Sequence, residues 1–448
     1  MRILVIGAGT TGFHVASHLL QESHDVVLVD RDEARLREVE EQLDLMTVHG
    51  NGASPPVLAQ AGLPQSDLVV AVTNSDEVNV LICAFARLAG VRHKIARISQ
   101  PEFIEHPEYD LSKIGVDLAV NQKREAAADL LNALRFPGAV EVVDLLDGRI
   151  LAVGLTVHMD SPLLRAPLRS FPEPGRLAKI RFIAGLRGSD LLVPRGDTTF
   201  MIGDTVYLTG RPEDVSEFIR WAWPEAARFD KTIIGGGGDL GLSLARLIEG
   251  QETPAVLIER DPAQAARCAE QLDQVSVVKG DALDQETLEQ VGVPKNSAFV
   301  AAMAHDEDNI MACLVANKLG ARFTAAAIDK SAYLSIIRSL SLVDRTINPH
   351  LTMVSAILHF IRGRNVSAAS IFSHLPGEML EVVLSEHSRW TGGAIRGLRI
   401  PEGANIVAIL RGDELMPATG ETEMRSGDRV VVFCSPGVSS KLKAVLHK

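Results

Sequence analysis

The sequence contains one long domain twice. The segment RILVIGAGTTGFHVASHLL near the start matches KTIIGGGGDLGLSLARLIE later in the chain, and this places Gly7 opposite Gly236 at an offset of 229 residues. Further along, Asp76-Glu77-Val78-Asn79 matches Asp306-Glu307-Asp308-Asn309 at an offset of 230. Agreement over so long a stretch, with the spacing changed by only one inserted residue, indicates a duplicated domain. The chain must therefore fold as a tandem repeat.

A shorter unit follows each copy and is also repeated. RGSDLLVPRGDTTFMIGDTVYL aligns with RGDELMPATGETEMRSGDRVVV, with Arg187 opposite Arg411 and Asp204 opposite Asp428. Helical patterning stops near Phe136-Pro137-Gly138, in the linker Trp223-Pro224, and near Gly363-Arg364-Asn365, as expected at domain boundaries. We therefore predict four domains, spanning residues 1–136, 137–223, 230–362 and 363–448.

Short apolar runs alternate with helical patterns in each long unit. The runs are rich in Val, Ile and Leu without polar alternation, which is typical of a parallel sheet covered by helices on both faces. The predicted strands of the first copy are Ile3–Ile6, Val26–Asp30, Leu45–His49, Leu68–Val72 and Lys94–Ile98, and the predicted helices are Phe13–Gln21, Glu33–Gln42, Pro55–Ala61 and Glu77–Leu88. The pattern predicts an α/β class with two doubly wound Rossmann domains. The short units predict small α+β modules with strands such as Ile150–Val157 and Thr205–Thr209 and closing helices at Pro212–Trp221 and Ser439–Leu446.

Composition excludes several classes of protein. A net charge of −12 disfavours nucleic acid as a partner, and no apolar stretch reaches the roughly 18–20 residues of a membrane-spanning helix. The start of the sequence carries no pattern typical of an export signal. The four cysteines lie far apart without a CxxC pair, which disfavours a disulfide scaffold or structural zinc site and fits a reducing cytoplasm.

A glycine-rich turn opens the first copy in the context that dinucleotide binding requires. The turn lies between a predicted strand and helix, and Asp30 ends the next strand. In such a turn the first glycine allows the bend, the second lets the backbone approach a pyrophosphate, and the third lets the helix pack closely. The candidate nucleotide-binding residues of this copy are Gly7, Gly9, Thr10, Thr11, Gly12, Asp30, Arg31, Asn51, Thr73, Asn74 and Arg97.

The same residues indicate which ligand the first copy favours. A carboxylate at Asp30 binds ribose hydroxyls and repels a 2′-phosphate, so NAD or NADH is favoured over NADP, although Arg31 beside it would soften the repulsion. ATP and ADP share the adenosine half and stay open as ligands. Arg97 can form bidentate bonds to phosphate, and a surface ion pair is the alternative interpretation. An empty, purely structural pocket is the alternative for the whole site.

The second copy repeats the arrangement with differences. Its candidate residues are Gly236, Gly237, Gly238, Asp239, Gly241 and Glu259. Glu259 can reach the same ribose hydroxyls as Asp30. Asp239 would repel a pyrophosphate if its carboxylate faced inward, and the counterpart of Arg97 is Ala327. An empty or weakly occupied second pocket therefore stays open.

Other residue clusters favour structure over chemistry. His14 and His18 have the spacing of two metal ligands without a third, and the acidic run after His305 complements a helix dipole as readily as it would hold a cation. Cys83 and Cys313 occupy matching positions and are expected to be buried. An oxidoreductase would need a substrate domain with a general acid or base. Since the short units offer none, we predict no catalytic and no metal-binding residues, and a bound nucleotide that acts as a signal.

The whole chain resembles the TrkA family, the cytoplasmic regulatory subunits of bacterial Trk potassium-uptake systems. GAGTTG, VVLVDRDEARL, VHGNGASPPVL, DLVVAVTNSDEVN and KIARI are similar to the first regulator-of-potassium-conductance (RCK) domain, and IIGGGGDLGLSLARLIE, LIERD, DNIMACLVANKLGA and TMVSAIL to the second. The short units are similar to RCK C-terminal domains. Thr11 departs from the family, which usually has an aliphatic residue there.

The resemblance implies a regulatory role rather than an enzymatic one. It implies a homotetrameric ring on the inner face of the cell membrane, docked on an integral membrane potassium-transporting subunit. It also implies that NAD(H), ATP or ADP at the Rossmann sites controls transport. The rival interpretations are an NAD-dependent oxidoreductase and a nucleotide sensor that regulates a different transporter.

Overall fold

The protein forms two compact units, each assembled from two separate stretches of the chain. The structure is a computed structural model that describes residues 1–448 except 101, 106–109, 146–148, 172, 178, 189, 224–228, 252, 365–374, 413, 417, 439–440 and 443–448. Residues 1–131 and 229–360 form one unit, called here the Rossmann unit, and residues 132–228 and 361–448 form the other, called the antiparallel unit. The boundary between the units falls inside one long helix of each Rossmann domain.

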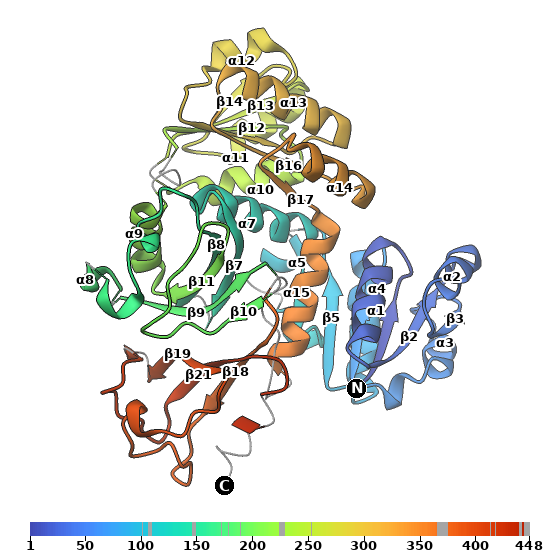
Figure 1. Cartoon of the computed structure of the whole chain (residues 1–448). Helices are drawn as coiled ribbons and strands as arrows, with labels where there is room; N and C mark the ends of the chain where they lie inside the picture. Colours follow the sequence, from blue (N-terminus) through green and yellow to red (C-terminus); the bar gives the residue numbers. More distant parts are fainter. Residues whose placement is uncertain are drawn as a thin grey trace. The chain divides into compact units, whose positions relative to one another are not determined.

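The first Rossmann domain contains a parallel sheet that is drawn in blue in Figure 1. The strand order is β3 (Met46–His49), β2 (Asp25–Asp30), β1 (Arg2–Ile6), β4 (Leu68–Ala71), β5 (His93–Arg97) and β6 (Leu118–Val120). The helices are α1 (Thr10–Gln21), α2 (Glu33–Glu40), α3 (Pro55–Gln60), α4 (Asp76–Leu88), α5 (Glu102–Glu105), α6 (Leu111–Ile114) and α7 (Gln122–Arg135). All four residues of β4 are buried, as expected for a strand covered on both faces. The predicted Rossmann fold is confirmed.

The second Rossmann domain repeats this strand order and lies in the yellow to orange part of Figure 1. The order is β14 (Ser276–Lys279), β13 (Ala255–Glu259), β12 (Lys231–Gly235), β15 (Ser297–Ala301), β16 (Phe323–Ala327) and β17 (Arg345–Ile347). The helices are α10 (Asp239–Ile248), α11 (Pro262–Gln271), α12 (Gln285–Val291), α13 (Asp306–Leu319), α14 (Ser331–Leu340) and α15 (Pro349–Arg364). In both domains the strand order reverses beside the first strand, and ligands of open α/β sheets bind in the crevice at that point.

The antiparallel unit contains two antiparallel sheets, one from each short repeat. The first follows the order β10 (Asp190–Leu192), β9 (Ile180–Arg187), β11 (Thr205–Gly210), β8 (Ile150–Thr156) and β7 (Ala139–Leu145), and is followed by α9 (Pro212–Ala222). A short helix, α8 (Pro174–Leu177), precedes β9. The second follows β18 (Glu378–Val383), β21 (Arg429–Cys434), β19 (Ala404–Arg411) and β20 (Glu414–Met416). The predicted closing helix Ser439–Leu446 lies mostly outside the described residues.

The two antiparallel sheets share one apolar core. Ala184 and Tyr207 of the first sheet belong to the same buried cluster as Val407 and Phe433 of the second. The amide nitrogen Nδ2 of Asn405 donates hydrogen bonds to the carbonyl oxygens of residues 182 and 183, at 2.9 and 3.1 Å. The two short repeats therefore form one folded body.

A buried ion pair explains why the short repeats match at Arg187/Arg411 and Asp204/Asp428. The guanidinium of Arg187 donates two hydrogen bonds to Asp204, at 2.9 and 2.8 Å, and the backbone amide of Met201 donates a third at 2.8 Å. Arg411 donates two to Asp428, at 2.8 and 2.9 Å. Burial alone would raise the pKa of each aspartate, but these hydrogen bonds outweigh it and hold the pKa below its usual value.

No helix among the described residues is both long and apolar enough to cross a membrane. The domain boundaries predicted at 136/137, 223/230 and 362/363 stay predictions.

Candidate nucleotide-binding sites

The three glycines of the first turn have different local surroundings. Gly7 has φ +113°, and a Cβ there would lie 2.8 Å from the carbonyl oxygen of Val72. A Cβ on Gly12 would lie 1.7 Å from the carbonyl oxygen of Gly7, so helix α1 can approach the turn only with glycine at this position. A Cβ on Gly9 would meet nothing within 4 Å. The open space beside Gly9 is where a ligand could approach the backbone.

Asp30 lies at the end of β2 and holds the loops that surround the first cavity. Its Oδ2 accepts a hydrogen bond from the amide of Ala8 at 2.5 Å, and its Oδ1 accepts one from the amide of Asp32 at 2.9 Å. Each carboxylate oxygen keeps a further lone pair for a ribose hydroxyl. The cavity beside it measures about 360 Å³ and is lined by Gly7, Gly9, Asp30, Arg31, Asn51, Thr73 and Asn74, among other residues.

A second cavity of about 370 Å³ lies at the phosphate end of the first site, over the start of α1. Thr10, Thr11 and Arg97 line it together with Gly9 and Asn74, which line both cavities. The buried Nε of Arg97 has no hydrogen-bond partner, and within the described residues Arg97 forms no ion pair. The surface ion pair that we considered for Arg97 is therefore not seen in the described part of the chain. An orphaned guanidinium nitrogen beside a helix N-terminus fits an anionic group such as phosphate.

Two pairs of equivalent residues stabilise the strand ends and loops next to each site. They are Asp76/Asp306 and Asn79/Asn309. The side chain of Asn79 accepts a hydrogen bond from the amide of Thr73 at 2.9 Å and donates to the carbonyl of Arg97 at 2.9 Å. Asp76 accepts hydrogen bonds from the amides of residues 99 and 100, both at 2.8 Å. Asn309 and Asp306 make the equivalent bonds in the second domain. These residues tie together the ends of neighbouring strands, a role that their repetition alone did not reveal.

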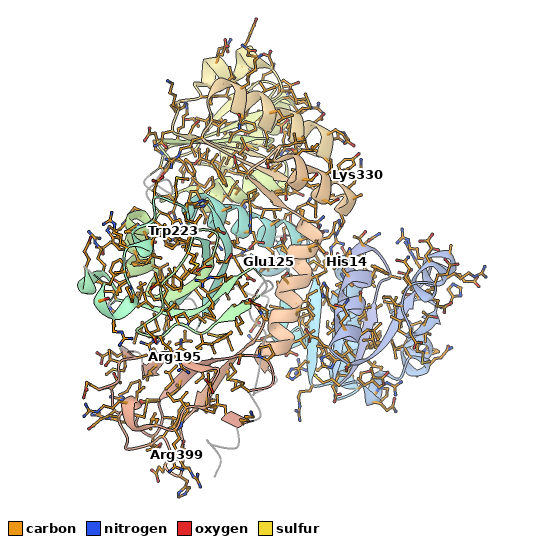
Figure 2. The ribbon with its side chains drawn as sticks, viewed as in Figure 1. His14, Glu125, Arg195, Trp223, Lys330 and Arg399 are labelled. Atoms are coloured by element: carbon orange, nitrogen blue, oxygen red, sulfur yellow. The ribbon has the colours of Figure 1, made fainter. Side chains whose placement is uncertain are left out.

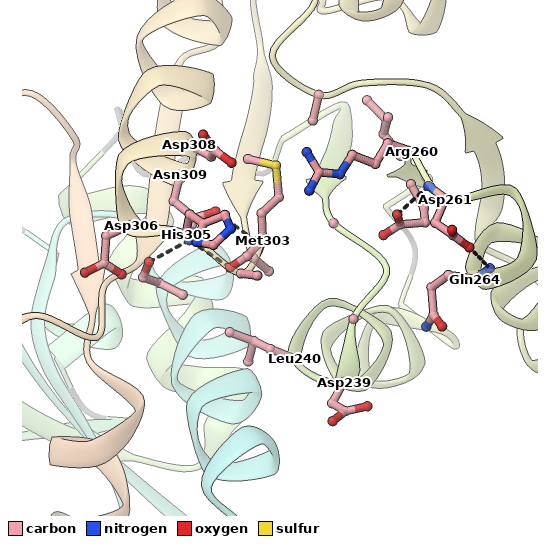
Figure 3. A pocket seen from close by; sticks show the side chains of 18 of the residues that line it. Asp239, Leu240, Arg260, Asp261, Gln264, Met303, His305, Asp306, Asp308 and Asn309 are labelled. Atoms are coloured by element: carbon pink, nitrogen blue, oxygen red, sulfur yellow. Dashed lines mark hydrogen bonds between the residues drawn. The ribbon is translucent and has the colours of Figure 1, made fainter. Parts of the chain in front are cut away.

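The second site has the same turn and a larger cavity of about 450 Å³, shown in Figure 3. Gly236 has φ +104°, and a Cβ on Gly241 would lie 1.9 Å from its carbonyl oxygen. Glu259 accepts hydrogen bonds from the amides of Gly237 and Asp261, at 2.6 and 2.8 Å. Gly236, Gly238, Asp239 and Glu259 line the cavity, whereas Gly237 and Gly241, like Gly12 in the first site, do not.

The two sites differ in charge. Arginines and acids balance in the first, where Arg31, Arg35 and Arg97 face Asp30, Asp32 and Glu38. The lining of the second is mostly acidic, with Lys123 and Arg260 against Asp239, Glu259, Asp261, Asp281, Asp306, Asp308 and Asp329. Figure 3 shows the carboxylate of Asp239 pointing away from Met303 and His305, although Asp239 is among the residues that line the cavity. The negative charge of a phosphate would be better compensated in the first site than in the second.

The surroundings of the remaining histidine and cysteine candidates indicate structural roles. His14 and His18 lie on α1, where burial and the charge of His18 lower the pKa of His14. Among the described residues no three His, Cys, Asp or Glu side chains are arranged to hold a metal ion. Cys83 and Cys313 are buried as predicted. Burial raises the pKa of Cys83 to about 12 and raises that of Cys313 as well, so neither is a reactive thiolate at neutral pH.

Among the lining residues that were not predicted, two reach a cavity from the other Rossmann domain. Lys123 of α7, in the first Rossmann domain, lines the second cavity. His350 of α15, in the second Rossmann domain, lines the phosphate end of the first. Nothing in the spacing of the sequence indicates that a helix of one domain reaches the site of the other.

Comparison with protein families identifies all four domains. The sequence model of the TrkA-N domain matches residues 3–122 and 232–349, and that of the TrkA-C domain matches residues 152–222 and 379–447. The chain belongs to the TrkA family.

Curated relatives match over nearly their whole length. The Trk system potassium uptake protein TrkA of Vibrio alginolyticus is 31% identical, over 97% of this chain and 95% of that protein. The TrkA homolog of Archaeoglobus fulgidus is 29% identical over 100% of both chains.

Solved structures show the same fold at low sequence identity. The structure named "GsuK channel bound to NAD" is 19% identical with a TM-score of 0.63, over 99% of this chain and 78% of that chain. The GsuK RCK domain is 19% identical with a TM-score of 0.61, over 99% of this chain and 94% of that chain. The predicted RCK architecture of two Rossmann domains, each followed by a C-terminal domain, is therefore confirmed.

Proposed function

We propose that the protein is the regulatory, nucleotide-binding subunit of a Trk-type potassium uptake system. The observation that carries this proposal is the pairing of two glycine-turn cavities, each with a carboxylate at the end of its second strand, in a chain that matches potassium uptake proteins along its whole length. The nucleotide acts as a signal, because binding to one conformation more tightly than to another shifts the balance between them.

NAD or NADH is the proposed ligand, and ATP or ADP is the alternative. The first site offers a carboxylate for the ribose, open backbone at Gly9 for the pyrophosphate, and the orphaned Nε of Arg97 for a phosphate oxygen. In the bound state Asp30 would hold the ribose hydroxyls and exclude a 2′-phosphate. The second site, with its acidic lining, binds the same ligand more weakly.

The partner is an integral membrane potassium-transporting subunit, on whose inner face the protein docks as a homotetramer. The support for the partner is the family, since its members are named as potassium uptake proteins. The tetramer and the peripheral location rest on the resemblance alone. Co-purification with a membrane protein, and cross-linking of the complex, would test both.

The test of ligand binding is calorimetric titration of the purified protein with NADH, NAD, ATP and ADP. We expect the tightest binding at the first site, its loss in Asp30→Ala, and a weaker second site that is lost in Glu259→Ala. The matched control is Asp190→Ala, which removes an exposed aspartate of the antiparallel unit, far along the chain from both glycine turns. If none of the four nucleotides binds the wild type, the proposal is wrong.

The test of transport separates regulation from the two rival functions. In cells without their own regulatory subunit, the wild type should restore nucleotide-dependent potassium uptake and Asp30→Ala should not. Oxidation of NADH with any added substrate would favour an oxidoreductase. Binding without any effect on potassium uptake would favour a sensor of another transporter.

A hinge after the fifth strand is the proposed link between binding and transport. The segment 121–135 contains α7, a continuous helix inside which the division between the two compact units falls, and Gly138 follows it with φ +82°. Stiffening the junction at Pro137-Gly138 should leave nucleotide affinity unchanged and abolish the transport response. An unchanged response would refute the hinge.

A further inference from the structure

Helices α7 and α15 begin in the same way in the two Rossmann domains. Asn121 precedes α7, and its Oδ1 accepts hydrogen bonds from the amides of Lys123 and Arg124, both at 3.0 Å. Asn348 precedes α15, and its Oδ1 accepts one from the amide of Leu351 at 3.0 Å. Each asparagine also donates from Nδ2 to the loop after the fifth strand of its own domain. Lys123 and His350 are therefore the second residues of two equivalently anchored helices.

Each of these two residues lies at the site of the other domain. His350 lines the phosphate end of the first cavity, beside Arg97 and the start of α1. Lys123 lines the second cavity, as does Asp239 at the start of α10. Both Rossmann domains belong to one compact unit, so this exchange takes place within a single folded body.

The two sites differ in the residue available to bind His350 or Lys123. Thr11 Oγ1 and His350 Nδ1 lie 3.2 Å apart, and Thr11 is 3% exposed. The position equivalent to Thr11 is Leu240, which has no polar group. Lys123 Nζ accordingly makes no hydrogen bond or ion pair among the described residues. An ammonium without a partner at the edge of an acidic cavity fits an anionic ligand group.

The surroundings of His350 determine how it responds to an anion. Burial lowers its pKa, and Arg97, Lys123 and His14 lower it further, while Asp329 opposes them. The imidazole is therefore neutral over most of the range near pH 7. A bound phosphate would neutralise the neighbouring cations and favour the protonated ring.

We propose that each Rossmann domain supplies a phosphate-binding cation to the nucleotide site of the other. His350 of the second domain completes the first site, and Lys123 of the first domain completes the second. The ligand class is a nucleotide with a pyrophosphate or polyphosphate chain. The inference rests on the proposed function, because it names further residues of the same sites. Its consequence is that a nucleotide in either site contacts both Rossmann domains at once.

The test is a crossed set of binding measurements with NADH. Glu259→Ala isolates the first site and Asp30→Ala isolates the second. In the Glu259→Ala background, His350→Ala should weaken binding about tenfold and Lys123→Ala should not weaken it. In the Asp30→Ala background the pattern should reverse. Lys123→Arg, which keeps the charge, should restore most of the affinity.

Matched controls remove the same charge or ring nearby. Arg124→Ala lies next to Lys123 on the same helix and does not line the cavity. His18→Ala removes an exposed imidazole from α1, one helical turn after His14. Neither should change affinity, and thermal melts of every variant should show that it folds. If His350→Ala fails to fold, His350→Gln replaces it with a side chain of similar size.

The pH dependence gives a readout that a purely structural role would not produce. NAD is the probe, because its pyrophosphate does not titrate near neutral pH. Affinity at the first site should fall as the pH rises through the pKa of the imidazolium in the complex, since the ring then loses its proton, and His350→Gln should abolish that dependence. His14→Gln should keep it.

The outcomes separate this inference from the proposed function. If the wild type binds no nucleotide, both fail. If the wild type binds and the substitutions have no effect, or weaken only the site of the domain that carries them, the exchange alone is wrong. Absence of binding in the Asp30→Ala background would overturn the part of the inference that concerns Lys123.

Discussion

At the scale of single residues, the glycine turn contains one glycine that packing requires and another that leaves space for a ligand. Gly12 is required by packing, because its Cβ would overlap the backbone of the turn, whereas no described residue comes within 4 Å of a Cβ built on Gly9. These two glycines belong to one motif in the sequence, and only the geometry tells their roles apart. Substitution by alanine should therefore have opposite effects on folding and on binding.

Gly12→Ala should destabilise the protein by about 3 kcal/mol or more, because the new methyl group meets a backbone oxygen that cannot move aside. Gly9→Ala should change the free energy of unfolding by less than about 0.5 kcal/mol and weaken NADH binding by about tenfold or more. Chemical denaturation and calorimetric titration would measure the two effects. A Gly9→Ala protein that binds normally would contradict the placement of the ligand over this turn.

Two half-buried carboxylates on α7 provide a test based on pH. Glu125, labelled in Figure 2, and Asp129 lie one turn apart, and Thr352 of α15 donates a hydrogen bond to Asp129 at 3.1 Å. Burial raises the pKa of both groups, and the charge of Asp129 raises that of Glu125 further. A folded-state pKa above the unfolded value means that the native state binds more protons, so stability falls as the pH rises through this window.

Asp129→Asn should therefore raise the Tm at pH 8 by about 2 °C or more, and by less at pH 5, because the amide removes a charge that burial disfavours and can still accept from Thr352. Thermal melts across that pH range would show it. Asp110→Asn, at an exposed helix cap, is a suitable control. A Tm that falls equally at both pH values would mean that the charge itself stabilises the helix crossing.

At the scale of elements, the sequence predicted the first five strands and the first four helices of the first Rossmann domain to within about one to three residues, and missed α5, α6 and α7. The buried strands are short continuous apolar runs, and their length together with their content of Val and Ile distinguishes them from buried helices. The sixth strands, β6 and β17, were missed because three residues each are too short to show a period. Lys123 and His350 were missed because local sequence patterns do not show which helix of one domain lies at the site of the other.

The repeated ion pair of the antiparallel unit belongs to this scale. Asp204 and Asp428 are 1% and 0% exposed, and each anchors a turn to a strand through its arginine. Asp204→Asn or Asp428→Asn should destabilise the unit by about 2–3 kcal/mol, since an arginine loses its charged partner. Because the folded-state pKa is depressed, this stabilisation is present at neutral pH and is lost as the pH falls through the folded pKa. Denaturation at pH 7 and pH 3 would test it, and a mutant as stable as the wild type at pH 7 would refute it.

At the scale of the whole molecule, each compact unit combines two distant stretches of the chain and has apolar clusters of its own. Clusters around β1 and β12 belong to the Rossmann unit, and the cluster shared by the two antiparallel sheets belongs to the other. Both proposed nucleotide sites lie in the Rossmann unit. A ligand should therefore stabilise one unit directly and the other only through the helices that connect them.

We expect calorimetric unfolding to show two transitions, of which NADH raises only that of the Rossmann unit. At a free concentration of about 100 times Kd, one site contributes about 2.7 kcal/mol to the stability of the state that binds. Asp204→Asn should lower the other transition and leave the NADH-sensitive one in place, while Asp30→Ala should remove most of the NADH shift. A single transition that NADH and Asp204→Asn both move as a whole would mean that the two units unfold together, and that the helices α7 and α15 transmit the full binding energy between them.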